Sequence, residues 1–294
     1  MNGRIQDRRG VLAAVVVSLG LLLVAPLAFA QAPDSRVVAP SAAQSETGGR
    51  YSDWGAAWWQ YVYAIPRQDN PLLDETGAKC QVGQPSGPAN VFFLVGALNT
   101  SHMATRTCTV PAGKRLFFPL LNIEVDNGGA VAPLPTGSNP QSWRAQGPLR
   151  LNAAGLPEAI TELHASVDGG QIGDLLSYRT RSPNFPYTFP ATSNIIGFPD
   201  HNIACTVPTS STSPTCTDTP PPPPPTPPSP FPWPGLTCTR DTPSTPSMCT
   251  NPLAVGDGFY LMLKPLSPGR HTVNFGGTCC GGFTLDITYY LTVN

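Results

Sequence analysis

Three polar side chains that alternate with apolar ones form the strongest candidate site in the sequence. They are Asn122, Glu124 and Asp126, and they are separated by Ile123 and Val125. Successive side chains of a β-strand point to opposite faces, so the three polar groups would lie along one face. The pattern therefore predicts a strand that ends with an amide and two carboxylates on the same side.

Three interpretations of these groups stay open. The carboxylates of Glu124 and Asp126 would lie roughly 6–7 Å apart on a strand, and such a pair can act as acid and base on a glycosidic bond. Together with Asn122 they could instead bind Ca²⁺, which takes oxygen ligands; no other cofactor is expected. The third interpretation is an ordinary solvated strand end before the turn at 127–129.

A second acidic pair, Asp74 and Glu75, lies in a loop rich in turn-forming residues. Asp74 is either the carboxylate that works with Glu124 in place of Asp126, or a turn residue. The sequence contains no G-x-S-x-G, H-E-x-x-H, Walker A or G-x-G-x-x-G motif. This makes the common hydrolases, zinc proteases and nucleotide-binding enzymes less probable.

One amphipathic helix is predicted over 52–65, with Ser52 as its cap and Pro66 at its end. Its apolar stripe recurs at spacings of four, three and four residues and consists of Trp54, Trp58, Tyr61 and Ile65. Trp54 and Trp58 are candidate ligand-binding residues, because a sugar ring can stack on an aromatic side chain. The alternative is that the stripe packs on a sheet, as helical spacing usually indicates.

The rest of the chain is typical of a mainly β protein. Strands are expected over 90–98, 107–110, 114–126, 161–168, 258–266, 271–275 and 283–293. The segments 107–110 and 114–126 are expected to form a hairpin across the turn at 111–113. The last strand alternates apolar and polar residues, which is typical of an antiparallel sheet with one wet face. We therefore expect an antiparallel β-sandwich or jelly roll with the helix laid against it.

The N-terminus carries the pattern of a cleaved signal peptide over 1–30. Three arginines precede the apolar run 11–23, and Ala28-Phe29-Ala30 forms a small-x-small cleavage site. The sequence therefore predicts an exported protein, periplasmic or extracellular in a bacterium, with no membrane span after cleavage. Residues 31–49 have no pattern and are expected to be flexible, and 50–294 would form one domain.

Charge argues against nucleic acid as a partner. The whole chain has 17 basic and 18 acidic residues, and removal of three arginines and one aspartate with the signal peptide leaves 14 and 17. A net charge of −3 is unsuited to binding phosphates. Charged residues make up only 12% of the chain, so its surface is rich in neutral polar groups. Polysaccharide or the cell envelope is the expected partner, and the oligomeric state stays open.

The segment 208–234 holds 13 of the 36 prolines and is expected to be a disordered or polyproline surface insert. A linker between two domains is the alternative. All eight cysteines follow the signal peptide, and an even number in an exported chain indicates disulfides. Cys205, Cys216, Cys238 and Cys249 flank the insert and could pin it, whereas Cys279 and Cys280 are either bonded to separate partners or free.

Several stretches together resemble an uncharacterised family of exported bacterial proteins with a Trp-rich N-terminal helix and a β-sandwich body. The stretches are YSDWGAAWWQYVYAIP, NPLLDETGAKC, CTVPAGKRLFFPLLN, LKPLSPGRHTVNFGG and FTLDITYYLTV. The resemblance implies no catalytic residue, since no activity is established for that family. It does imply that Cys80 and Cys108 are bonded to each other.

These features support three hypotheses for function. The first is a non-enzymatic exported protein that binds a ligand, with carbohydrate as the favoured class, or that associates with the envelope. The second is an exported carbohydrate-active enzyme that uses Glu124 with Asp126 or Asp74. The third is a structural surface protein whose Pro-rich insert contacts the cell wall or a partner.

Overall fold

A computed structural model describes residues 34–86, 90–126, 155–196, 202–206, 215–219, 237–239 and 247–294. It confirms a mainly β protein in which two sheets pack together, consistent with a β-sandwich. Phe118 of one sheet and Phe275 of the other lie fully buried with ring centroids 4.4 Å apart. Within the described residues, no helix is long and apolar enough to cross a membrane.

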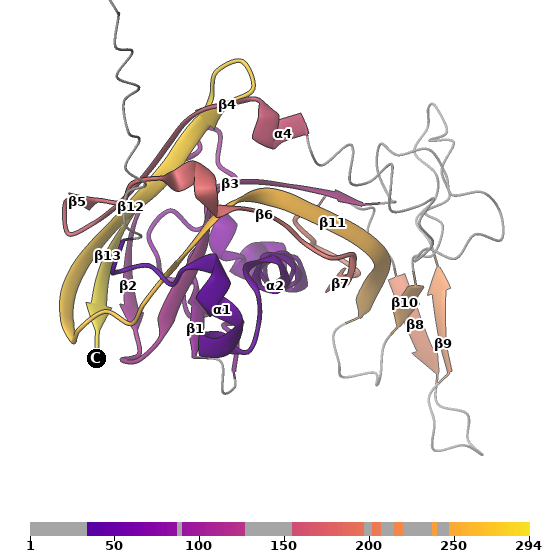
Figure 1. Cartoon of the computed structure of the whole chain (residues 1–294). Coiled ribbons are helices and arrows are strands. Elements are labelled where there is room, and N and C mark those ends of the chain that lie inside the picture. The colour runs from indigo at the N-terminus through magenta and orange to yellow at the C-terminus, as the bar shows by residue number, and fades with distance from the viewer. Residues whose placement is uncertain are drawn as a thin grey trace, which may run out of the picture. The chain divides into compact units, whose positions relative to one another are not determined.

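The first sheet, sheet A, is built around two long strands, β3 (Arg115–Asp126) and β11 (Met248–Leu263). They pair antiparallel from Leu263 to Ala254, with one irregularity between Phe259 and Tyr260. The other strands described in this sheet are β1 (Val91–Phe93), β10 (Thr237–Thr239), β6 (Arg179–Arg181) and β7 (Phe185–Pro190). Figure 1 shows β3 and β11 side by side.

The second sheet, sheet B, has β12 (Gly269–Cys279) and β13 (Phe283–Val293) at its centre. The other strands described in it are β2 (Met103–Val110), β4 (Ile160–Val167) and β5 (Gly170–Gln171). The alternation predicted for the last strand is confirmed, because Leu285, Ile287, Tyr289, Leu291 and Val293 are all buried. Phe283, at the start of β13, is the exception and is 36% exposed.

One expectation about strand pairing is wrong. The hairpin between 107–110 and 114–126 does not form, because β2 pairs with β13 in sheet B and β3 pairs with β11 in sheet A. The chain therefore changes sheets at the turn 111–114. Each sheet also contains one parallel pair, β1 with β3 and β2 with β13, so neither sheet is purely antiparallel.

The predicted helix is confirmed as α2 (Tyr51–Ala64), which contacts β7, β11 and β3 of sheet A. It begins one residue earlier than expected. Ser52 therefore lies inside the helix, and the carboxylate of Asp53 accepts the backbone N–H of Arg50 over 2.9 Å. The remaining short helices are α1 (Pro40–Thr47), α4 (Gly155–Glu158), and the 3₁₀ turns η1 (Arg67–Asp69), η2 (Pro71–Leu73) and η3 (Leu175–Tyr178).

The expectation that residues 31–49 are flexible is wrong for the described residues, 34–49. Val38 is fully buried, and its N–H donates to the carbonyl of Met262 in β11 over 2.8 Å. Helix α1 follows and buries Ala43. The sequence shows no pattern here because two adjacent apolar residues, Val37 and Val38, are enough to anchor the segment.

The Pro-rich segment interrupts one sandwich and does not link two. Residues before it supply β3 and β4, and residues after it supply β11 and β12, their partners in sheets A and B. Part of the predicted disordered insert is ordered, since β9 (Thr215–Thr219) pairs with β8 (Asn202–Thr206). The six consecutive prolines at 220–225 lie outside the described residues.

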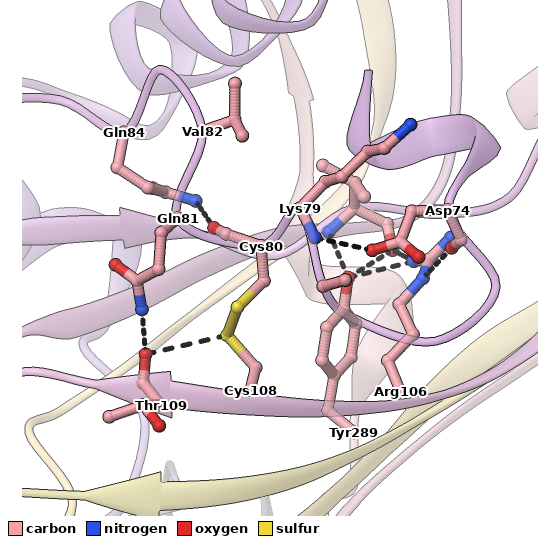
Figure 2. The surroundings of a disulfide bond; sticks show 12 residues. Asp74, Lys79, Cys80, Gln81, Val82, Gln84, Arg106, Cys108, Thr109 and Tyr289 are labelled. Carbon is pink, nitrogen blue, oxygen red and sulfur yellow. Dashed lines mark hydrogen bonds between the residues drawn. A yellow bond between two sulfur atoms is a disulfide. The ribbon is translucent and has the colours of Figure 1, made fainter. Parts of the chain in front are cut away.

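The disulfide between Cys80 and Cys108 is present, with Cα atoms 6.1 Å apart, as the family resemblance implied. Cys238 and Cys249 form a second bond between β10 and β11, so they do not clamp the insert from both sides. Figure 2 shows the first bond beside the side chain of Arg106.

Arg106 is a buried cation in sheet B and is only 1% exposed. It donates hydrogen bonds to the carbonyl oxygen of Asp74 over 2.6 Å and to the hydroxyl of Tyr289 over 2.9 Å (Figure 2). A third hydrogen bond goes to the carbonyl oxygen of Val95 over 2.8 Å. These bonds from Nε and Nη1 offset part of the lost hydration and attach the loop 70–80 to the sandwich, whereas Nη2 has no hydrogen-bond partner.

Candidate functional site

A pocket of about 870 Å³ lies where helix α2, the end of β3 and the β12–β13 turn meet. Its volume is typical of sites that bind small organic molecules. The described residues that line it are Trp58, Trp59, Tyr63, Leu72, Gly96, Ala97, Leu98, Pro119, Leu121, Asn122, Glu124, Val125, Asp126, Ile195, Ile196, Cys279, Cys280, Phe283 and Leu285.

Glu124 is the carboxylic acid of this pocket whose pKa is raised. Its Oε2 accepts a hydrogen bond from the hydroxyl of Tyr63 over 2.8 Å, whereas its Oε1 is closed off from solvent and has no hydrogen-bond partner. Burial, together with the negative charge of Asp126, raises the pKa of Glu124 to about 8. The carboxyl group is therefore largely protonated at neutral pH.

Asp126 follows Glu124 on the same face of β3 and is held by a second tyrosine. The hydroxyl of Tyr187 in β7 donates to Oδ2 of Asp126, and Asn251 donates to the same hydroxyl over 3.3 Å. Tyr63 and Tyr187 have ring centroids 4.6 Å apart. The two carboxyl groups thus each bind one member of a tyrosine pair. Burial and the nearby carboxylates raise the pKa of both phenols, which keeps them protonated.

An aromatic wall closes the pocket on the side of helix α2. Ring centroids lie 5.0 Å apart for Trp58 and Trp59, and 5.3 Å apart for Trp59 and Tyr63. Trp58 is 2% exposed and donates from Nε1 to the carbonyl of Leu94 over 2.9 Å, so it is fixed. Trp59 is partly exposed, and its Nε1 makes no hydrogen bond of good geometry, although it lies near enough to the hydroxyl of Tyr260 to interact with it.

The structure brings most of the predicted site residues together. Asn122, Glu124, Asp126 and Trp58 all line the pocket, and Asn122 also donates to the hydroxyl of Tyr260 over 3.3 Å. The three residues of β3 are partly buried, which argues against the solvated strand end.

Two other candidates lie outside the pocket lining. Trp54 donates from Nε1 to Thr47 Oγ1 over 2.7 Å and packs against the core. The carboxylate of Asp74 accepts the backbone N–H groups of Thr76 and Lys79 over 2.9 and 2.8 Å. Burial opposes ionisation there, but these donors lower the pKa of Asp74. Asp74 is therefore a turn residue, as one of the two interpretations held.

Three residues that shape the site were not among the predicted ones. Trp59 and Tyr63 lie on α2 four residues apart, beside the stripe that was identified, and a wider apolar arc of the helix would have included them. Tyr187 lies in β7, a strand between prolines. Its contact with Asp126 depends on the pairing of β7 with β11, which the sequence does not reveal.

Metal binding at this site stays a prediction. Among the described residues, no group of three or more His, Cys, Asp or Glu side chains is arranged to hold a metal ion. The Ca²⁺ ligands considered were Glu124, Asp126 and Asn122. The first two already accept hydrogen bonds from tyrosines.

Two free cysteines line the pocket at the β12–β13 turn. Cys279 is buried and Cys280 is exposed, and neither forms a disulfide. Burial, together with contact with the Cys280 thiol, raises the pKa of Cys279 to about 12. Cys279 is therefore an unreactive thiol at neutral pH.

A second polar cluster, on sheet B, has the contacts of a Ser–His–Asp arrangement. His271 Nδ1 lies 2.8 Å from Asp168 Oδ2, and its Nε2 lies 3.3 Å from Ser267 Oγ. The same Nε2 lies closer, 2.9 Å, to the carbonyl oxygen of Ser267. Both ring nitrogens therefore face acceptors, and hydrogen bonding to Asp168 raises the pKa of His271. Because Nε2 lies closer to the carbonyl oxygen of Ser267 than to its hydroxyl, the ring is poorly placed to take the proton of that hydroxyl, and the contacts join His271 to Asp168 and Ser267.

No protein-family model, curated protein or solved structure matches this chain. Its function therefore has to be inferred from the geometry of the pocket.

Proposed function

We propose that the protein is an exported binding protein whose pocket at Glu124 takes a small organic ligand, with a sugar unit as the favoured class. The observation that carries this proposal is the buried carboxyl of Glu124, which has one unpaired oxygen beside an aromatic wall. Buried polar atoms without partners are rare in proteins and mark places where a ligand group can pair.

Export is supported by the signal-peptide pattern at 1–30 and by two disulfides among the described cysteines. A sugar is supported by the combination of aromatic faces with amide and carboxyl groups, because sugar rings have apolar faces and hydroxyl edges. Trp59 and Tyr63 supply rings, and Asn122 and Asp126 supply polar groups.

Thermal unfolding and isothermal titration calorimetry with a panel of soluble oligosaccharides test this function. We expect at least one oligosaccharide to raise the melting temperature and to bind with a one-to-one stoichiometry. The variant Asp126→Asn should change that affinity. The matched control Glu162→Gln alters an exposed carboxylate of β4 and should leave it unchanged. If no oligosaccharide binds, the sugar class is wrong.

An exported carbohydrate-active enzyme is the second candidate, and the pKa of Glu124 favours it. A carboxyl group with a pKa of about 8 keeps its proton at neutral pH and can act as a general acid, while Asp126 is the second carboxyl group. Chromatography of the oligosaccharides after long incubation separates the two functions. Cleaved products that disappear in Glu124→Gln would establish the enzyme, and intact sugars with measurable binding would establish the binding protein.

A further inference from the structure

Two polar atoms of the pocket lining have no hydrogen-bond partner. They are Nε1 of Trp59 and Oε1 of Glu124, and both are closed off from solvent. An unpaired buried polar group is costly, so a ligand atom that pairs with it gains affinity.

The two atoms belong to side chains that lie next to each other. Gly256 pairs directly with Glu124 across β11 and β3, and side chains of such a pair point to the same face. A Cβ atom added to Gly256 would lie 2.9 Å from Nε1 of Trp59. Because Gly256 has no side chain, the indole N–H of Trp59 can lie opposite Glu124, close to where the Cβ of a larger residue would be.

Both atoms are donors at neutral pH. The indole nitrogen can only donate. Tyr63 already donates to Oε2 of Glu124, so the proton of the neutral carboxyl group is placed on Oε1. Burial and the charge of Asp126 keep that group neutral below its pKa of about 8.

We propose that these two donors bind the carbonyl oxygen of an acetamido group, so that the ligand is an N-acetylated sugar. This proposal rests on the proposed function and adds specificity to it. A neutral acceptor suits the site better than a carboxylate, because the negative charge of Asp126 lies close by. The acetamido methyl group suits the apolar rim, where Leu98 is 52% exposed and Phe283 is 36% exposed.

Several other titratable groups face Glu124 from the elements packed around it. They are Tyr63 on α2, Asp126 on β3, Tyr187 on β7, Tyr260 on β11, and Cys279 and Cys280 at the end of β12. Asp257 of β11 is opposite Ile123, so its side chain points to the other face of the sheet. Burial raises the pKa of the three tyrosines and of Cys279, so none of them loses its proton near pH 8. Asp257 is fully buried and ion-paired with Arg179 and Arg181.

Three trisaccharides of equal length test the proposal by calorimetry with the full-length mature protein. Triacetylchitotriose carries the acetamido group, cellotriose has a hydroxyl in its place, and unacetylated chitotriose has an amine. We expect triacetylchitotriose to bind at least tenfold more tightly than either of the others, because only it offers a carbonyl acceptor to both donors.

Variants identify the donors. Trp59→Phe removes one donor and should weaken triacetylchitotriose binding about tenfold. The control Trp54→Phe changes an indole outside the lining and should have no effect. Glu124→Gln keeps a donor at the same position, so binding should persist and become independent of pH between 7 and 9. Glu124→Met removes the donor, so binding of triacetylchitotriose should be lost. In the parent protein affinity should fall as the pH rises through about 8.

Equal affinity for cellotriose and triacetylchitotriose would overturn the acetamido assignment and leave the proposed function intact. Tightest binding of chitotriose would also overturn it, because an amine offers no carbonyl oxygen to the two donors. Loss of binding in Glu124→Gln, with an unchanged melting curve, would show that the carboxylate accepts and does not donate. Absence of binding by all three would overturn this inference, and the wider panel of oligosaccharides would decide the sugar-binding function separately.

Discussion

The hydroxyl of Tyr63 donates a hydrogen bond to Oε2 of Glu124 over 2.8 Å, and this contact joins helix α2 to strand β3. It also determines which oxygen of the carboxyl group is paired, and Oε1 is left without a hydrogen-bond partner. The orientation of the pocket's main acid is therefore set by a residue sixty-one positions away in the chain.

Removal of that hydroxyl should raise the pKa of Glu124 further. The hydrogen bond from Tyr63 favours the ionised carboxyl group, and Tyr63→Phe takes it away while keeping the ring. We also expect a loss of about 1–2 kcal/mol of stability, since Oε2 loses its partner. Carbon-13 NMR titration of the Glu124 carboxyl measures the pKa. The control Tyr61→Phe removes a hydroxyl that donates to the carbonyl oxygen of Val82, and it should leave the pKa of Glu124 unchanged.

Stability should fall between about pH 4.5 and pH 8 because of Glu124. Its pKa rises from an ordinary 4.5 to about 8 on folding, so in this range the folded chain binds more protons than the unfolded chain. The contribution of protonated Glu124 to the free energy of unfolding is fully present below pH 4.5 and is lost as the pH rises through 8. The slope from one such group is at most about 1.4 kcal/mol per pH unit.

Glu124→Gln should reduce the change of stability with pH. Chemical denaturation at a series of pH values measures this change. The variant should be more stable than the parent above pH 8. A parent protein whose stability does not change over this range would contradict the raised pKa.

The bond between Cys80 and Cys108 should contribute more than the bond between Cys238 and Cys249. The first closes a loop with a sequence separation of 28 residues and the second closes one of 11. Longer loops lose more entropy when they are closed in the unfolded chain. Replacing both members of the first pair by alanine should cost about 2–4 kcal/mol. Differential scanning calorimetry of the two double variants gives the comparison, and equal melting curves would refute it.

Arg106→Met should destabilise the fold by about 2–4 kcal/mol. The variant keeps the apolar part of the side chain but leaves the carbonyl oxygens of Asp74 and Val95 without their donor. Urea denaturation measures the loss. The control Arg270→Met alters an exposed arginine of β12 and should change stability by less than about 0.5 kcal/mol.

The candidate site was predictable where it depends on strand periodicity. Glu124 and Asp126 share a face because every second side chain of a strand does, and the sequence shows that directly. Their tyrosine partners were not predictable, because Tyr63 comes from the helix and Tyr187 from an edge segment. Contacts of that kind arise only when both elements have packed on sheet A.

The fold was predictable in its class but not in its pairings. Alternation in β13 and the apolar run in β3 indicate a half-buried sheet and a core strand. The turn at 111–114 reads as a hairpin because local spacing cannot show which sheet each flanking strand will join. Burial of Val38 was missed for a related reason, since two residues are too few to form a pattern.

The change of sheet between β2 and β3 has a consequence for the order of assembly. β3 pairs with β11, β4 with β12 and β2 with β13, so each of these earlier strands pairs with a strand that follows residue 247. Pairings so distant along the chain are slow to form, because a long loop must close before any contact stabilises it. The sandwich therefore cannot close before β13 has been synthesised, and a chain that lacks β11 to β13 would have no partners for β2, β3 and β4 in these pairings.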